Sequence, residues 1–547
     1  MQEGKNKRLT NLRTKSETGL DYVMSQLSIE TPFGRQQLKE LKPCYPGDEA
    51  LLIAEYDRMD KLIQLANNKP KAVSQLKEAF MMIKDVRGSV ARCKENTLSV
   101  VELFELKSFL LTTREIRRIS IGSKVELPEE LIVKDTDQVL DLLDPRKDRI
   151  NTFYIYDDFS EALASMREGK RVLEKELRKH QKRLKAEIKD EYGIELTPKF
   201  DIVIPKSSEK LEIARNIGLL EQIEEDYNSV IFKLVNDEVA FDFAQQLAQM
   251  DLQIDQLELE IQQELSRKIW EHADVILDNC QIVGKLDLTL AKALYGLKNN
   301  CIRPEIVCEH VIDIVEGRQL QVESILRSKG KSYTPVSIKL EEGVTCITGA
   351  NMGGKTISLK LSGLIPLMAQ YGFLVPCKQA KIGLSSFVQI LIGDSQSVER
   401  GLSSFGSEME ELKEILDNSK ARALILIDEI ASGTNPIEGL ALTKSLVDYL
   451  KEKPYISLIT THFDAVAENP HVVNMQVRGL ADVDFSKLDS QLRYANRKER
   501  INIIGRYMDY RLIRVDEERQ IPKDALNIAK MLGIDKAIIQ RAQEYIK

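Results

Sequence analysis

Eight residues in the second half of the chain have the types and spacing of a phosphate-binding loop, or P-loop. They follow the pattern G-x-x-x-x-G-K-[ST] and are Gly349, Ala350, Asn351, Met352, Gly353, Gly354, Lys355 and Thr356. Glycines let such a loop curl until backbone N–H groups point at phosphate oxygens. The lysine supplies positive charge to the β- and γ-phosphates, and the final hydroxyl is a ligand for Mg²⁺. The sequence therefore predicts binding of ATP with Mg²⁺.

A pair of carboxylates follows farther along the chain. Residues 423–427 are all apolar, as in a strand buried on both faces, and Asp428 and Glu429 come directly after them. Acids at the carboxyl end of a parallel strand lie where ligands bind in such sheets. We expect Asp428 to hold Mg²⁺ through water and Glu429 to act as the general base that polarises the attacking water.

A third apolar run, 456–460, ends in Thr461 and His462. A polar side chain at that edge of a sheet can reach the γ-phosphate and report its presence. A single histidine is more often structural than functional, but this position favours a functional role for His462.

These residues need a scaffold, and the pattern around them predicts one. Four apolar runs, at 344–348, 387–392, 423–427 and 456–460, alternate with helical segments. Continuous apolar strands interleaved with helices are typical of a mostly parallel sheet covered on both faces. We expect this α/β domain to span residues 301–495. Two short helices around Gly533 are predicted in the region that follows, 496–547.

The first part of the chain reads as helical. Residues 1–19 are polar and basic, and we expect a tail there. Apolar residues at helical spacing predict a helical core over 20–160. Within it, Leu127 to Asp158 contains two prolines and ends in the β-prone run 152–156, which predicts a short hairpin or connector.

Residues 161–300 have the pattern of a two-helix stalk. Apolar stripes recur in the runs 161–189 and 247–265, which predicts two antiparallel arms. The sequence between them changes character, with strand-like runs at 200–204 and 230–235 around a short helix. We therefore expect a small α/β tip over about 191–240.

Composition narrows the class of protein. The net charge of −7 neither requires nor excludes nucleic-acid binding, because local patches decide phosphate contacts. The seven cysteines are scattered without a C-x-x-C pair, which favours idle thiols over disulfides or zinc. No run reaches the roughly 18 apolar residues of a membrane span, and the N-terminus does not resemble a signal peptide. We expect a cytoplasmic protein with no membrane partner.

Several segments resemble motifs of the MutS family of ATPases. Residues 348–356 (TGANMGGKT) resemble the family's Walker A sequence TGPNMGGK[ST], and 426–439 (LIDEIASGTNPIEG) its extended Walker B sequence. Further similarities lie in the following segments: 367–376 (LMAQYGFLVP), 392–397 (IGDSQS), 401–405 (GLSSF, like the signature SLSTF) and 460–463 (TTHF, like ATHY/F). The order of these motifs also matches the family.

The resemblance implies a fold and an assembly. It implies a multidomain chain with a mainly α-helical core and stalk, a small α/β tip, an α/β P-loop ATPase domain of the ABC/MutS type, and a C-terminal helix-turn-helix. MutS ATPases are dimers with composite sites, so Ser403 would face the γ-phosphate bound by the partner subunit, and residues 522–546 would support dimerisation, as a homodimer or a MutS-like heterodimer. ATP binding would then move the stalk and its clamp-like tip.

The sequence also departs from the family pattern. We expect no mismatch-reading domain, because the helical core begins near residue 20, and no C-terminal nuclease domain, because the sequence stops at Lys547. The family's GRHP element reads GRQL at 317–320, and its PND reads PVS at 335–337. These changes affect contacts to adenine rather than to phosphate.

Two clients of the stalk remain open, DNA and protein. The tip, 191–236, has nine acids and five bases, which suits phosphate contacts poorly, whereas the first arm, 167–189, has ten bases and four acids. A charge-dense helix is most often a solvated face. One hypothesis is a DNA-acting clamp for branched or unusual duplex, related to mismatch repair. The alternative is a reactivating chaperone subunit for a cobalamin-dependent lysine or ornithine aminomutase. A scaffold with little turnover is less favoured, because the two acids at 428 and 429 are intact.

Overall fold

The chain is described from a computed structural model. The structure describes residues 8–123, 125–235, 237–349, 354–393, 404–467, 471–480, 507–515 and 524–546, together with 483, 488, 500 and 503. The chain divides into two compact units, each described by itself below. The first comprises 1–77, 120–131 and 284–547, and the second comprises 78–119 and 132–283.

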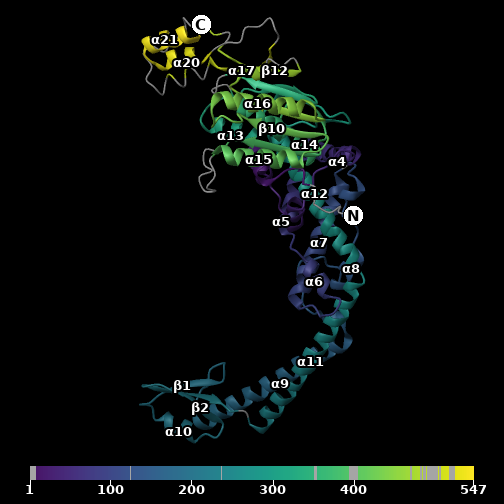
Figure 1. Cartoon of the computed structure of the whole chain (residues 1–547). Helices are drawn as coiled ribbons and strands as arrows, with labels where there is room; N and C mark the ends of the chain where they lie inside the picture. The colour runs from purple at the N-terminus through teal and green to yellow at the C-terminus, as the bar shows by residue number, and fades with distance from the viewer. Residues whose placement is uncertain are drawn as a thin grey trace. The chain divides into compact units, whose positions relative to one another are not determined.

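A six-stranded sheet organises the first unit (Figure 1). Its strand order is β13-β12-β7-β11-β10-β9, with every pair parallel except β12 and β13. The strands are β7 (Gly343–Thr348), β9 (Phe387–Ile392), β10 (Ala423–Asp428), β11 (Tyr455–Thr460), β12 (Val472–Gly479) and β13 (Asp509–Arg514). The mostly parallel sheet predicted from four apolar runs is confirmed, and the chain is an α/β multidomain protein rich in helices.

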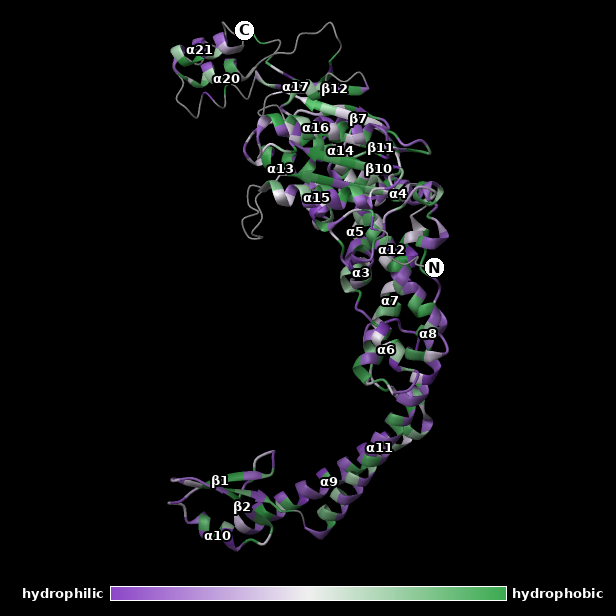
Figure 2. Ribbon diagram, viewed as in Figure 1, coloured by the Kyte–Doolittle hydropathy of each residue, from purple (hydrophilic) through white to green (hydrophobic). Residues whose placement is uncertain are grey.

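Helices cover both faces of this sheet because its strands are apolar on both sides. Leu424 and Leu426 of β10 pack with α14, whereas Ile425 and Ile427 pack with α15 and α16. Successive side chains of a strand point to opposite faces, so an unbroken apolar run needs a cover on each. The strands accordingly appear as apolar ribbons between the helices in Figure 2. The covering helices are α14 (Lys355–Gln370), α15 (Ser404–Asn418), α16 (Pro436–Lys451) and α17 (Asp464–Ala467).

A second sheet of four short strands, ordered β4-β8-β5-β6, also belongs to the first unit. Sequence analysis did not predict it, because its strands are only three to six residues long, although β6 has the alternation of a half-exposed strand. The elements of this region are β4 (Glu305–Val307), β5 (Ile312–Gly317), α13 (Leu320–Ser328), β6 (Val336–Leu340) and β8 (Gln379–Gly383).

The helical character of the N-terminal part is as predicted, except at its start. Residues expected to be a polar tail include a helix, α1, which is N-capped by Asn11 and ends at Gly19 with φ 85°. Helix α1 spans Leu12–Thr18. The helices that follow it up to residue 122 are α2 (Leu20–Ser25), α3 (Pro32–Lys39), α4 (Glu49–Asn68), α5 (Pro70–Met82), α6 (Arg87–Arg92) and α7 (Val100–Gly122), and α12 (Ala273–Lys298) comes later in the chain.

The second unit contains the two predicted antiparallel arms, α9 (Glu161–Tyr192) and α11 (Glu238–Trp270). Ion pairs fix their register: Arg167 Nη2 lies 2.6 Å from Glu258 Oε1, Lys170 pairs with Asp251, and His180 Nε2 lies 2.8 Å from Asp237 Oδ2. Residue numbers rise along one arm as they fall along the other, so the helices run in opposite directions.

A small α/β tip joins the two arms, as predicted (Figure 1). Its antiparallel sheet has the order β1-β3-β2. Strands β1 and β3 match the predicted runs, whereas β2 was missed because five of its six residues are exposed, so the strand has no apolar alternation. The elements are β1 (Asp201–Pro205), α10 (Lys210–Asn216), β2 (Leu220–Glu225) and β3 (Ser229–Leu234).

The prediction of a hairpin within Leu127 to Asp158 is wrong, and these residues form a connector instead. These residues contain no strand; they form η1 (Glu129–Leu131), α8 (Asp137–Leu143) and η2 (Asp157–Phe159). The β-prone run 152–156 is held by side chains instead of by a strand partner. Lys107, whose side chain is 1% exposed, donates from Nζ to Thr152 O at 3.0 Å and lies 3.1 Å from Asp144 Oδ1.

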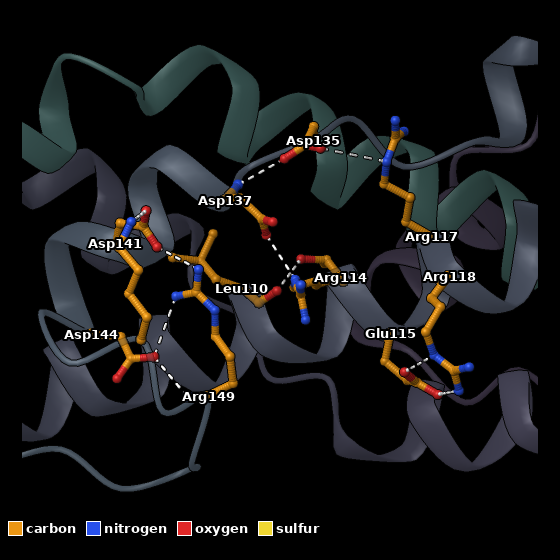
Figure 3. A network of polar contacts seen from close by, with 12 residues as sticks. Leu110, Arg114, Glu115, Arg117, Arg118, Asp135, Asp137, Asp141, Asp144 and Arg149 are labelled. Atoms are coloured by element: carbon orange, nitrogen blue, oxygen red, sulfur yellow. Dashed lines mark hydrogen bonds and ion pairs between the residues drawn. The ribbon is translucent and has the colours of Figure 1, made fainter.

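Asp144 belongs to a wider polar network between α7 and this connector (Figure 3). Arg114 Nε donates to Asp137 Oδ1 at 2.9 Å, and the guanidinium of Arg149 reaches both Asp141 and Asp144. Burial alone would raise the pKa of the Asp144 carboxyl, but its bonds with the Arg149 N–H and Lys107 outweigh burial, and the pKa lies below its ordinary value. The connector is therefore held by charge rather than by a β-ladder.

The C-terminal residues form the two predicted short helices, α20 (Asp524–Leu532) and α21 (Lys536–Ile546), on either side of Gly533 with φ 93°. None of the helices in the described part of the chain is long and apolar enough to cross a membrane.

Replacing Lys107 by methionine tests the buried pair. The change keeps the length and volume of the side chain but leaves Asp144 buried without its nearest cation. We expect the second unit to lose about 3 kcal/mol of unfolding free energy, measured by urea unfolding and by amide exchange in α8. Arg118→Ala is the control, because the Arg118–Glu115 pair is exposed and its loss should leave both readouts unchanged. Equal exchange rates in Lys107→Met and the native chain would contradict the assignment.

Candidate functional site

The strand–loop–helix around the predicted phosphate loop is present at β7 and α14. β7 ends at Thr348, and α14 begins at Lys355 after Gly354. Gly349 and Gly354 have φ of 115° and 76°, which residues with a Cβ rarely adopt. No side chain of the described residues caps the start of α14. Its first N–H groups are therefore suited to an anion, and the helix dipole favours negative charge there.

The ammonium of Lys355 lies where three strands end. Its side chain is 2% exposed, and Nζ lies 2.6 Å from Gly349 O, 3.2 Å from His462 Nδ1 and 3.2 Å from Glu429 Oε1. Glu429 follows β10 and His462 follows β11, the two strands beside β7. A buried cation beside a helix N-terminus is a strong attractor for phosphate.

Thr356 and Asp428 form a second contact across the same edge. Thr356 Oγ1 donates to Asp428 Oδ2 at 2.8 Å, and Thr460 Oγ1 donates to Asp428 Oδ1. Asp428 is 7% exposed, so these bonds fix its orientation. A hydroxyl beside a carboxylate offers the hard oxygen ligands that Mg²⁺ prefers.

Glu429 is held in an uncommon backbone conformation. Its φ is 47°, and Ala431 nearby has φ 59°. The Glu429 N–H donates to Thr460 O at 3.0 Å and to Thr460 Oγ1 at 3.1 Å, while its carboxylate Oε1 lies 2.8 Å from His462 Nε2. Left-handed backbone at non-glycine residues often marks functional sites. Here it turns the glutamate away from its neighbour Asp428 and toward His462.

A pocket of about 200 Å³ opens beside this glutamate. Glu429, Thr461 and His462 line one part of it, and Thr434, Pro436 and Phe463 are among the other residues that line it. The volume is enough for several water molecules. A water there would lie next to the carboxylate that could polarise it.

The structure thus brings together five of the residues singled out from the sequence: Lys355, Thr356, Asp428, Glu429 and His462. Gly349 and Gly354 border the same site. The remaining predicted residues, Ala350, Asn351, Met352, Gly353 and Ser403, lie outside the described residues.

Sequence reasoning missed three residues at this site. Thr460 orients Asp428, and its hydroxyl at the end of a buried strand was the available signal. Glu408 of α15 accepts from the Ala431 N–H at 3.3 Å, and burial raises the pKa of its carboxyl. The ring of Tyr510, from β13, lies so close to Gly354 that a Cβ there would be 3.2 Å from it. Nothing local in the sequence marks Tyr510, because β13 reaches the loop only through the fold.

The donor set fits a magnesium-bound triphosphate. Lys355 and the N–H groups at the start of α14 form a cationic cradle, and Thr356 and Asp428 form an oxygen pair for Mg²⁺. Glu429 and His462 lie beside a pocket that is large enough for several water molecules. The arrangement can hold phosphate and metal on one side and position a nucleophilic water on the other.

The part of the chain that contains this site, and longer stretches around it, are similar to known proteins. Residues 345–547 match the family model described as MutS domain V. Proteins named Endonuclease MutS2 are similar over longer stretches: that of Bacillus mycoides is 26% identical over 533 residues, which cover 94% of this chain and 62% of the relative. The Clostridium kluyveri protein is 33% identical over 290 residues, 52% of this chain and 33% of the relative. The Fusobacterium nucleatum protein is 30% identical over 339 residues, which cover 60% of this chain and 39% of the relative.

The chain spans less than two thirds of the length of the first of these relatives. The matched family model begins within β7 and includes Lys355, Asp428, Glu429 and His462, so the site described above lies inside it. On the family model and these relatives together, residues 345–547 form a MutS domain V, and the chain as a whole is similar to proteins named Endonuclease MutS2.

Proposed function

We propose that this chain binds ATP with Mg²⁺ and hydrolyses it, in a P-loop domain of the MutS type. The observation that carries the proposal is the meeting of Lys355, Thr356, Asp428 and Glu429 at the carboxyl edge of one parallel sheet. The match of residues 345–547 to MutS domain V supports the same activity.

Each residue has a distinct task in this proposal. Lys355 binds the β- and γ-phosphates, and Thr356 and Asp428 are the residues that would hold Mg²⁺. Bound Mg²⁺ supplies positive charge that neutralises the phosphate oxygens. Glu429 accepts the proton of the attacking water, and His462, 2.8 Å from Glu429 Oε1, orients that carboxylate and reaches toward the γ-phosphate. The half-buried Tyr510 ring beside Gly354 offers an apolar surface next to the nucleotide.

We also propose that two subunits share the site. Ser403 would complete the site of the partner subunit, and α20 with α21, as a helix-turn-helix, would support the dimer. Closed C2 dimers are the commonest assemblies, and a shared site makes hydrolysis depend on the dimer.

DNA is the client that the described residues favour. Many bases of α9 are neutralised in ion pairs with acids, among them Arg167 and Lys170 with α11. Lys175, Arg178 and Lys182 are exposed and lie three and four residues apart, on one face of the helix. Such a row can follow the phosphates of a duplex. The name of the relatives, Endonuclease MutS2, points the same way.

A protein client, such as an aminomutase to be reactivated, is the second candidate. It is favoured by the exposed acids of β2, Glu221, Glu224 and Glu225, at the tip. Those acids would repel a nucleic acid and attract a basic protein surface.

Glu429→Gln separates binding from hydrolysis. The amide keeps the size of the side chain but cannot take a proton, so turnover should fall roughly 10²- to 10⁴-fold while ATP still binds. Single-turnover hydrolysis and binding of a fluorescent ATP analogue measure the two effects. Lys355→Ala is the matched control, and it should lose binding as well. Near-normal turnover in Glu429→Gln would require a different base.

Mixing two inactive variants tests the shared site. Ser403→Ala and Lys355→Ala should each be nearly inactive alone. In a mixed dimer, one site combines an intact Lys355 with an intact Ser403 of the other subunit, so the mixture should regain roughly a quarter of native activity. A mixture as inactive as its parents would place Ser403 within its own subunit's site, or outside catalysis.

The triple variant Lys175→Ala, Arg178→Ala, Lys182→Ala tests the DNA proposal. Losing three phosphate contacts should weaken duplex binding and reduce the slope of log affinity against log salt by about 3, measured by fluorescence anisotropy. Alanine at the exposed Lys69, Lys71 and Lys329 of the first unit is the control and should change neither. If the native chain fails to bind duplex or branched DNA even at low salt, the protein-client function takes precedence.

A further inference from the structure

A second pocket, of about 480 Å³, lies within the first unit and is lined by residues of α3, α4, α12 and the end of α14. Its floor includes the buried residues Leu52, Leu288 and Lys292, and its rim includes the exposed residues Lys42 and Leu51. Pockets that hold organic ligands usually have volumes of about 300–1,000 Å³. This pocket is therefore large enough for a small molecule.

Hydrogen bonds hold one wall of this pocket in place. The Cys44 N–H donates to Gln370 O at 2.8 Å, and Gln370 Nε2 donates to Cys44 O at 2.8 Å. The amide of Gln370 also bonds the backbone of Ser385, since Nε2 donates to Ser385 O at 2.8 Å and Oε1 accepts from the Ser385 N–H at 3.2 Å. The wall is thus formed before any ligand arrives, which lowers the entropic cost of binding.

The ammonium of Lys292 lies at the floor of the pocket and can donate more hydrogen bonds than it makes. Its side chain is 2% exposed, and among the described residues Tyr371 O, at 3.0 Å, is the one acceptor within hydrogen-bond distance of Nζ. An ammonium has three N–H donors. Glu55 Oε1 lies farther away, at 3.8 Å, and the centroid of the Phe373 ring is 4.9 Å from Nζ. Burial lowers the pKa of Lys292, so these groups replace only part of the water that the ammonium has lost.

The acids near the pocket are already matched by other bases. Arg58 Nε and Nη2 donate to Glu55 Oε2 at 3.1 and 2.7 Å, and Lys285 forms an ion pair with Glu130. Burial alone would raise the pKa of the Glu55 carboxyl, but Lys292 and Arg58 outweigh burial and the pKa lies below its ordinary value. The lining contains more bases than acids, namely Lys42, Arg58, Lys285 and Lys292 against Glu40 and Glu55. This excess of positive charge favours an anionic ligand.

The apolar part of the lining determines the kind of anion. Leu41, Leu51, Leu52 and Leu288 all line the pocket. Against these side chains, inorganic phosphate would lose hydration without gaining hydrogen bonds, whereas an organic acid would bury its carbon body there. We propose that this pocket binds a small organic carboxylate, whose head group accepts hydrogen bonds from Lys292 and whose apolar body packs against the leucines.

This carboxylate site is separate from the phosphate loop. Helix α14 begins at Lys355 and ends at Gln370. A helix of that length separates its two ends by about 24 Å. The inference therefore does not rest on the proposed ATPase function, and a chain that fails to hydrolyse ATP would still bind the carboxylate.

Fluorine NMR with matched probes tests the inference. The carboxylate probes are para-fluorobenzoate and trifluorohexanoate, and para-fluorobenzyl alcohol and para-fluorobenzylamine keep the ring but replace the anion by a neutral or a positive group. At millimolar concentration, both carboxylates should bind the full chain, and the alcohol and amine should bind roughly 10-fold more weakly or less. Lys292→Met keeps the length of the side chain without its charge and should weaken carboxylate binding roughly 10- to 100-fold.

Further variants keep the test independent of a folding defect in Lys292→Met. Lys42→Glu reverses a charge at the exposed rim, so it should weaken carboxylate binding roughly threefold with an unchanged melting temperature. Lys69→Glu is the matched control, because it makes the same change at an exposed residue beyond the far end of α4, where salt screens the charge. Lys355→Ala is the control for the phosphate loop. Both controls should bind the carboxylates as tightly as the native chain does.

Several outcomes would overturn the inference. The native chain could bind neither carboxylate, or it could bind the alcohol or the amine as tightly as para-fluorobenzoate. Inorganic phosphate that displaced para-fluorobenzoate with equal affinity would show that the apolar lining contributes nothing. Loss of binding in Lys355→Ala would place the probe at the phosphate loop instead. Native affinity in both Lys292→Met and Lys42→Glu, or in Lys42→Glu alone should Lys292→Met not fold, would also exclude this pocket as the site.

Discussion

The arrangement of this chain depends on the parallel pairing of β7, β11, β10 and β9. Parallel strands carry their carboxyl ends to one edge, and whatever follows each strand must meet there. That is how Lys355, Asp428, Glu429 and His462, spread over more than a hundred residues, come to share one small volume. The pairing is possible only because both faces of the sheet are covered, by α14 on one side and by α15 and α16 on the other. The packing that buries the strands therefore also assembles the site.

The same constraint explains how much could be predicted from the sequence. Unbroken apolar runs identified β7, β9, β10 and β11, and the polar residues at their ends identified the site. The arms α9 and α11 could be predicted equally well, because long apolar stripes at helical spacing clearly indicate helices. In each case a regular period in the sequence matches a regular period in the backbone.

The other features could not be predicted from the sequence, because they depend on contacts between residues that are far apart in the chain. β2 is an exposed edge strand whose side chains have no apolar alternation. The run 152–156 favours a strand by composition, but Lys107 and Asp144 hold it in an irregular form. Tyr510 reaches the phosphate loop only through tertiary packing. Polar residues that act at long range carry no local signature, so the segment that contains α1 looked like a solvated tail.

The contact between the N-terminal segment and β9, in which Thr14 Oγ1 donates to Gln389 Oε1, has a consequence for how the protein is made. Thr14 and its partner Gln389 are separated by 375 positions, and the whole second unit, from residue 78 to 283 apart from one short excursion, is synthesised between them. Contacts of such high sequence separation form late, because a long loop must close before they contribute. During synthesis on the ribosome, the arms and tip can fold before β9, the partner of the N-terminal segment, has been made. Thr14 is thus translated long before Gln389, and the contact between them is among the last to form.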